Sequence, residues 1–172
     1  RLPSGKWTNP VNLSFASHEY SVAHPALSSD GKTPYFSSNM PGTHGGSDLY
    51  MSKFENGSWS APKNLGESIN TPGQEVFPTL YNDSILFFAS DGHSGLGGLD
   101  LFSCNVSAAE RTVANLGAPI NSRSDDFGIF MEPGGCSGFL SSNRPGGAGA
   151  DDIYFFEEIQ PYAEIQLYDS LT

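Results

Sequence analysis

The 172-residue sequence is poor in basic residues, in cysteine and in long apolar runs. It has 8 Lys and Arg against 19 Asp and Glu, a formal net charge of −11. Because binding to a phosphate backbone requires clustered Lys and Arg, we predict no nucleic-acid partner. No stretch approaches the roughly eighteen apolar residues of a membrane-spanning helix, so we predict no membrane span.

The two cysteines, Cys104 and Cys136, are too few for a disulfide framework and lack the spacing of metal ligands. They leave two alternatives open. They are either separate thiols or a single bridge between neighbouring repeats.

Glycine and proline are abundant, with 20 and 12 copies, while charged residues make up only 16%. This composition favours many short strands joined by tight turns, and the fold class we predict is all-β. One pattern, an apolar residue, a glycine-rich loop and then Asp-aliphatic-aromatic, recurs at residues 36–50, 88–102 and 140–154. Each copy follows the last by 52 residues, which fits the four-stranded blade of a β-propeller.

The predicted architecture is therefore a β-propeller region of about three four-stranded blades within residues 1–157. An unpaired fourth strand comes first, at residues 5–13. The three blades follow at residues 24–65, 76–116 and 127–156. In the first blade we expect one continuous fourth strand over 58–65, and a weakened or bulged position at Pro34, because proline deletes a ladder donor. Residues 158–172 are predicted to begin a following domain or linker, since AEIQLY breaks the repeat.

The repeated aspartates, Asp48, Asp100 and Asp152, directly follow the glycine-rich loops. Each carboxylate can accept hydrogen bonds from loop amides, and we predict this structural role. The alternative is an oxygen ligand for calcium, which needs more acids than one loop offers.

Other residues also recur at the repeat interval and are predicted to be structural. Tryptophan recurs at Trp7 and Trp59, where we expect blade core. Asparagine recurs at one repeat position as Asn12, Asn64 and Asn115. It recurs at a second position as Asn70 and Asn121, where we expect side-chain to backbone bonds that hold the link between blades.

We assign no catalytic, cofactor-binding or metal residue, and the sequence does not identify a binding site. The four histidines lack ligand spacing and occupy no shared repeat position: His18, His24, His44 and His93. The doubled acids at 125–126, 151–152 and 157–158 would point to opposite faces of a strand, which is poor geometry for paired acid and base work.

The motifs FSSNMPGTHGGSDLY, SWSAPKNLGESIN, ASDGHSGLGGLDLF and NLGAPINSRSDDFG together resemble the WD-like, TolB-type β-propeller repeats of OmpA-family outer-membrane lipoproteins from Bacteroidetes. The resemblance spans about residues 5–156. It implies a lipoprotein-anchored parent at the periplasmic face of the outer membrane, with envelope or type IX secretion proteins as partners. The family binds peptidoglycan through a separate C-terminal domain that this sequence lacks, so any such contact would be indirect.

From these observations we expect a non-catalytic interaction or scaffold module of the bacterial cell envelope. The alternatives are a glycan-processing propeller enzyme or glycan-binding module, and a calcium-stabilised structural module. The unpaired strand at 5–13 and the missing fourth strand of the last blade are complementary. We therefore also expect a homodimer by strand exchange, in which each chain is half of a six-bladed assembly; the competing expectation is a partial propeller whose remaining blades lie elsewhere in a larger protein.

Overall fold

The computed structural model describes residues 5–159, and these fold entirely as β-strands, turns and loops. Sheet one contains β1 (Val22–Leu27), β2 (Pro34–Ser38), β3 (Asp48–Met51) and β6 (Lys63–Asn64). Sheet two contains β7 (Glu75–Tyr81), β8 (Ile85–Ser90), β9 (Asp100–Asn105) and β10 (Val113–Asn115). Sheet three contains β11 (Asp126–Met131), β12 (Ser137–Ser142) and β13 (Asp152–Glu157). The predicted all-β class is confirmed.

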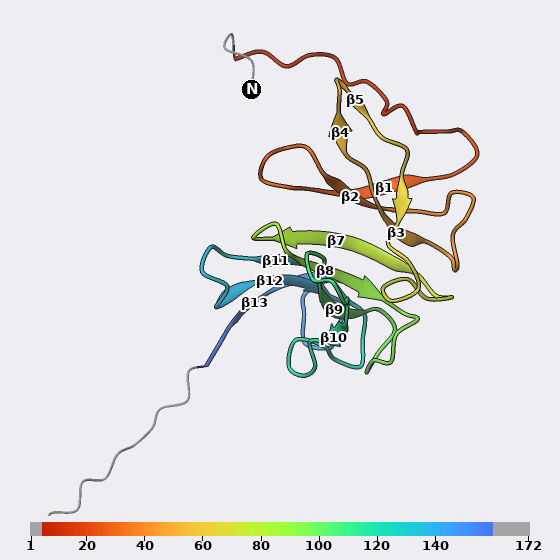
Figure 1. Cartoon of the computed structure of the whole chain (residues 1–172). Helices are drawn as coiled ribbons and strands as arrows, with labels where there is room; N and C mark the ends of the chain where they lie inside the picture. The colour runs from red at the N-terminus through yellow and green to blue at the C-terminus, as the bar shows by residue number, and fades with distance from the viewer. Residues whose placement is uncertain (1–4, 160–172) are drawn as a thin grey trace, which may run out of the picture.

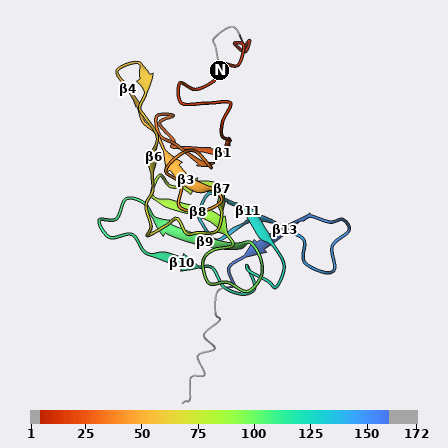
Figure 2. The same cartoon turned by 90° about the vertical axis from the view of Figure 1, so that its right-hand side faces the viewer.

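The three sheets repeat one plan, in which consecutive antiparallel strands lie side by side. Figure 2 shows β7 to β10 as successive rows of this kind. A separate hairpin of β4 (Phe54–Glu55) and β5 (Ser58–Trp59) projects from sheet one (Figure 1). Two hairpin turns, at Asn56-Gly57 and Asn82-Asp83, have positive φ at both central residues. This conformation suits tight hairpins because its twist matches that of the strands.

Sheet two lies between the other two sheets and packs on both. Leu86 and Phe88 of β8 join a core with residues of sheet one. Phe87 and Ala89, which alternate with them, join a second core with Leu140 of sheet three. Because side chains alternate across a strand, a middle strand covered on both faces must be apolar throughout.

Residues 5–13, predicted to be a strand, form none. The equivalent segments in the next two repeats pair with β3 and β9. A strand needs a neighbour to receive its backbone hydrogen bonds, and no described strand pairs with residues 5–13.

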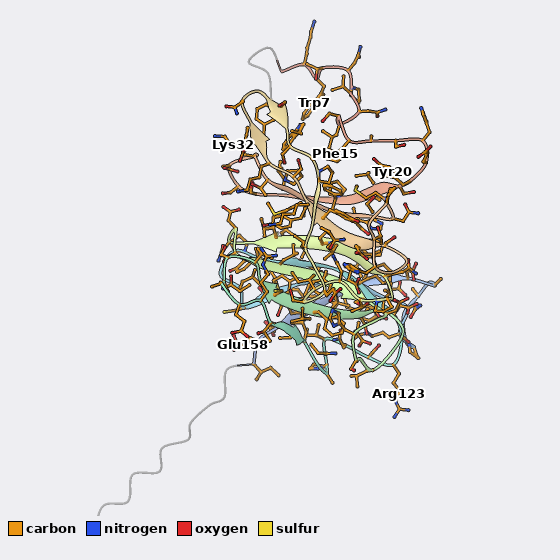
Figure 3. The ribbon with its side chains drawn as sticks, turned by 45° about the vertical axis from the view of Figure 1, so that its right-hand side comes forward. Trp7, Phe15, Tyr20, Lys32, Arg123 and Glu158 are labelled. Atoms are coloured by element: carbon orange, nitrogen blue, oxygen red, sulfur yellow. The ribbon has the colours of Figure 1, made fainter. Side chains whose placement is uncertain are left out.

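The predicted continuous strand over 58–65 is split into β5 and β6. Pro62 lies between the two pieces and cannot donate to a ladder. The prediction that tryptophan lies in the blade core is wrong for Trp7, which is 85% exposed. Figure 3 shows Trp7 at the end of the molecule that carries the N-terminal segment, outside sheets one to three. Trp59 is half-buried and meets Phe54 edge-on in the projecting hairpin, with ring centroids 5.0 Å apart.

The predicted irregularity at Pro34 is also wrong. Pro34 is the first residue of β2 and pairs in register with Leu27. A first strand position tolerates proline well. The bulge of sheet one falls instead in β1, between Ala23 and Ala26.

Cys104 is buried and Cys136 is exposed, and both are free thiols. The disulfide bridge between repeats is therefore not formed.

Residues 160–172, which hold most of the predicted following domain or linker, lie outside the described residues.

Candidate functional site

Asp48 is the first residue of β3 and is fully buried. Its carboxylate accepts hydrogen bonds from the backbone N–H groups of His44 (2.9 Å) and Gly45 (3.3 Å). The side-chain amide of Asn64 donates a third bond at 2.7 Å. Asp48 therefore ties its glycine-rich loop to the last strand of the sheet.

Asp100 and Asp152 occupy the same place in sheets two and three. Asp100 Oδ2 accepts bonds from Leu96 N and Gly97 N, each at 2.9 Å. Asp152 accepts one from Gly149 N at 3.0 Å. Within residues 5–159, Asp100 Oδ1 is the one buried side-chain oxygen without a hydrogen-bond partner.

Asn70, in the link between sheets one and two, forms hydrogen bonds with both backbone groups of Leu49 in β3. Its Oδ1 accepts from Leu49 N (2.8 Å), while its Nδ2 donates to Leu49 O (3.1 Å) and to Asn64 Oδ1 (2.8 Å). Asn121 repeats this pattern on Leu101 and Asn115. Each asparagine thus supplies the acceptor for a backbone N–H, while Leu49 O and Leu101 O also accept from Leu65 N and Leu116 N.

Two buried acids, whose structural role was not predicted from the sequence, open the first strands of sheets two and three. Glu75 accepts bonds from Thr71 N (2.9 Å), Thr71 Oγ1 (2.6 Å) and Ser90 Oγ (2.8 Å). Burial raises the pKa of Glu75 above its ordinary value, although these three bonds oppose the shift. Asp126 accepts from Ser122 N at 2.6 Å. The spacing of a hydroxyl residue four positions before a buried acid is the sequence signal that was missed.

The histidines lie at separate places. His18 and His44 are both exposed. His93 packs against Phe88 and Phe102, and its Nε2 lies 2.8 Å from the carbonyl oxygen of Ile69. Among the described residues no three His, Cys, Asp or Glu side chains form a group that could hold a metal ion. The calcium alternative therefore has no assembled ligand set in this part of the chain.

The first strands of the three sheets share a bulge at one repeat position. His24, Phe77 and Gly128 occupy it with φ of 52°, 52° and 61°. The pairing register shifts at each of these points. This left-handed conformation costs roughly 1–3 kcal/mol for a bulky residue, and such strain concentrates at functional sites.

The three bulges form a shallow groove of about 310 Å³ across β1, β7 and β11. The His24 ring stacks on Phe77 with centroids 4.1 Å apart, and Phe77 lies 5.2 Å from Phe127. Pro25 and Pro78 also line it, so two of its edge positions lack a backbone donor. Burial lowers the pKa of His24, which favours the neutral form of its ring.

The groove is mainly apolar and carries no assembled nucleophile, base and orienting group among the described residues. It suits the binding of an apolar or aromatic segment more than bond cleavage.

A search with protein-family models found no match to this chain, and a search of curated proteins found none either. Within residues 5–159 the chain has no helix long and apolar enough to cross a membrane.

Proposed function

We propose that this chain is a non-catalytic interaction and scaffold module, built as part of a β-propeller. The 52-residue period and the identical strand order of the three sheets support the propeller arrangement. The first strands lie next to one another, as His24, Phe77 and Phe127 show by their ring contacts.

The observation that carries the proposal is the groove over the three first-strand bulges. It combines exposed aromatic and proline surface with strained backbone, and each repeat contributes to it from the same position. The acids that recur with the repeat are instead engaged in internal hydrogen bonds. A non-catalytic role is favoured because the repeated acids hold the scaffold and the lining of the groove is mainly apolar.

The partner we propose is a protein segment of apolar and aromatic character. Its placement in the cell envelope, at the periplasmic face of the outer membrane and in some cases with type IX secretion proteins, rests on the resemblance of the repeat motifs alone. Any link to peptidoglycan would run through a different domain.

The test compares the wild-type chain with Thr79→Arg, which places a long charged side chain in the groove. Leu96→Arg is the matched control, because Leu96 is exposed on the loop before β9. Used as baits for envelope proteins, the wild type and the control should retain the same protein, and Thr79→Arg should lose it.

Equal capture by all three baits would contradict the groove assignment. Turnover of glycans or peptides by the purified chain, abolished by Thr79→Arg while the fold survives, would support the enzyme alternative. Saturable binding of soluble glycans in the groove would support the glycan-binding alternative.

A further inference from the structure

The outer face of sheet three, which points away from sheet two, carries four exposed apolar side chains on three adjacent strands: Phe130, Phe139, Ile153 and Phe155. Phe139 and Phe155 contact each other with ring centroids 5.4 Å apart. An apolar row of this kind on a sheet indicates an interaction surface.

The repeat shows what normally covers this face. The residues equivalent to Ile153, Leu49 in sheet one and Leu101 in sheet two, are both 0% exposed, whereas Ile153 is 76% exposed. Leu49 is buried by sheet two, and Leu101 by sheet three. In each case the covering side chain sits at one repeat position, Phe88 or Leu140.

The same covering position in sheet one is Phe36. Beside it lies a cavity of about 180 Å³, lined also by Leu13 and Val22. Phe15 stacks on Phe36 at 5.1 Å, much as Ile69 of the next link fills the space between sheets one and two. Phe15 covers Phe36, which is only 2% exposed, so the part of this face that is open to the outer face of sheet three is the cavity lined by Leu13 and Val22.

The free edge of β13 makes a second complementary surface. In sheets one and two the equivalent strands, β3 and β9, pair on this side with β6 and β10. No described strand pairs with this edge of β13, and a cavity of about 650 Å³ lies beside it, lined by Phe156 and by Ile120 of the preceding link.

The segment that matches this edge is 7–13, which contains the counterparts of β6. Asn12 and Leu13 stand where the next repeat has Asn64 and Leu65. Val11 is 86% exposed. In sheet one Asn64 donates to Asp48, whereas its counterpart in sheet two, Asn115, donates to Ser94 O.

We propose that two copies of this chain associate reciprocally through these surfaces. Residues 7–13 of each copy pair with the edge of β13 of the other, and sheet one of each covers the outer face of the other's sheet three. The edge of β13 then gains the kind of strand partner that β3 and β9 have within one chain. The outer face of sheet three is covered by a neighbouring sheet, as the equivalent faces of sheets one and two are. The proposal rests on the packing of the repeats, and its surfaces share with the groove the side chain of Phe130.

The first experiment measures the mass of the full chain by light scattering at micromolar concentration. We expect a mass near twice 18.4 kDa. Val11→Pro removes a ladder donor and Ile153→Asp charges the open face, so each variant should have the monomer mass with an unchanged circular dichroism spectrum. Leu96→Asp, a change at an exposed leucine away from both surfaces, should remain dimeric, as should Thr79→Arg.

The second experiment tests the register. Met51 pairs with Lys63 in sheet one, and the equivalent pair across two copies is Phe155 with Val11. In a Cys136→Ser background, a mixture of Val11→Cys and Phe155→Cys chains should form a disulfide-linked dimer on mild oxidation. A mixture of Leu96→Cys and Phe155→Cys chains is the control and should not.

A wild-type chain that is folded and monomeric would overturn the proposal, and so would a dimer that survives both Val11→Pro and Ile153→Asp. Thr79 belongs to neither proposed contact surface, although the groove that it lines also includes Phe130. Failure of the dimer therefore leaves the proposed function open to its own test.

Discussion

The guanidinium of Arg144 lies 2.5 Å from the carboxylate of Asp126, which is fully buried. Arg144 also donates to the carbonyl oxygens of Pro119 (3.2 Å) and Ile120 (2.7 Å), so it holds the link before sheet three against the sheet. In sheet one the equivalent positions are Val22 and Met40, an apolar pair.

Arg144→Ala should reduce the free energy of unfolding by about 3–5 kcal/mol, because it leaves a buried carboxylate without its partner. The double variant Asp126→Val with Arg144→Met copies the apolar pair of sheet one and should cost much less. Chemical denaturation checks both, with Arg123→Ala on the exposed surface as the control. Equal losses for the single and the double variant would contradict this account.

The stability contributed by Glu75 should fall as the pH rises. Burial raises the folded-state pKa of Glu75 above its unfolded value near 4.5. The protonated carboxyl is favoured in the folded state, so its contribution is complete below the unfolded pKa and is lost as the pH rises through the folded pKa.

Glu75→Gln keeps a neutral group in this place and should therefore gain stability relative to the wild type as the pH rises from 4 to 7. Denaturation midpoints of both proteins across that range provide the measurement. A difference between the two that does not change with pH would show that Glu75 does not titrate as described.

Asn70→Ala should destabilise the chain by about 1–3 kcal/mol, because the buried Leu49 N loses its acceptor and Leu49 O keeps only the bond from Leu65 N. Asn121→Ala should cost a similar amount, since its bonds to Leu101 are the same. Thermal and chemical denaturation test this, with the exposed Asn9→Ala as the control. A loss for one of the two variants and not the other would rule out an equivalent role.

Asp100→Ala should also cost about 1–3 kcal/mol, because the amides of Leu96 and Gly97 lose their acceptor. Asp152→Ala should cost less, since Asp152 accepts one loop amide and is only partly buried. The same melting curves are recorded with calcium and with a chelator. A calcium-dependent midpoint that disappears in Asp100→Asn would favour the metal-stabilised alternative.

Much of the fold could be predicted because its signals are local. The 52-residue interval, the turns at Asn56-Gly57 and Asn82-Asp83, and the strand Ile85–Ser90 each depend on residues close together in the chain. The pairing of a glycine-rich loop with the aspartate that follows it spans only three or four residues. Interactions of this range leave a readable pattern in the sequence.

The tertiary structure alone decided what depends on neighbours distant in the sequence. Arg144, which lies 18 residues from Asp126 in the sequence, provides the positive charge that stabilises the buried carboxylate. The two residue types alone do not predict that they pair. The left-handed bulge at Phe77 is supported by a stack with His24 from another sheet. Ile153 has the same local sequence context as the buried Leu101, and only the absence of a covering sheet among the described residues makes it exposed. Burial depends on packing between sheets. The repeated sequence specifies each sheet, but it does not specify which sheet lacks a covering neighbour.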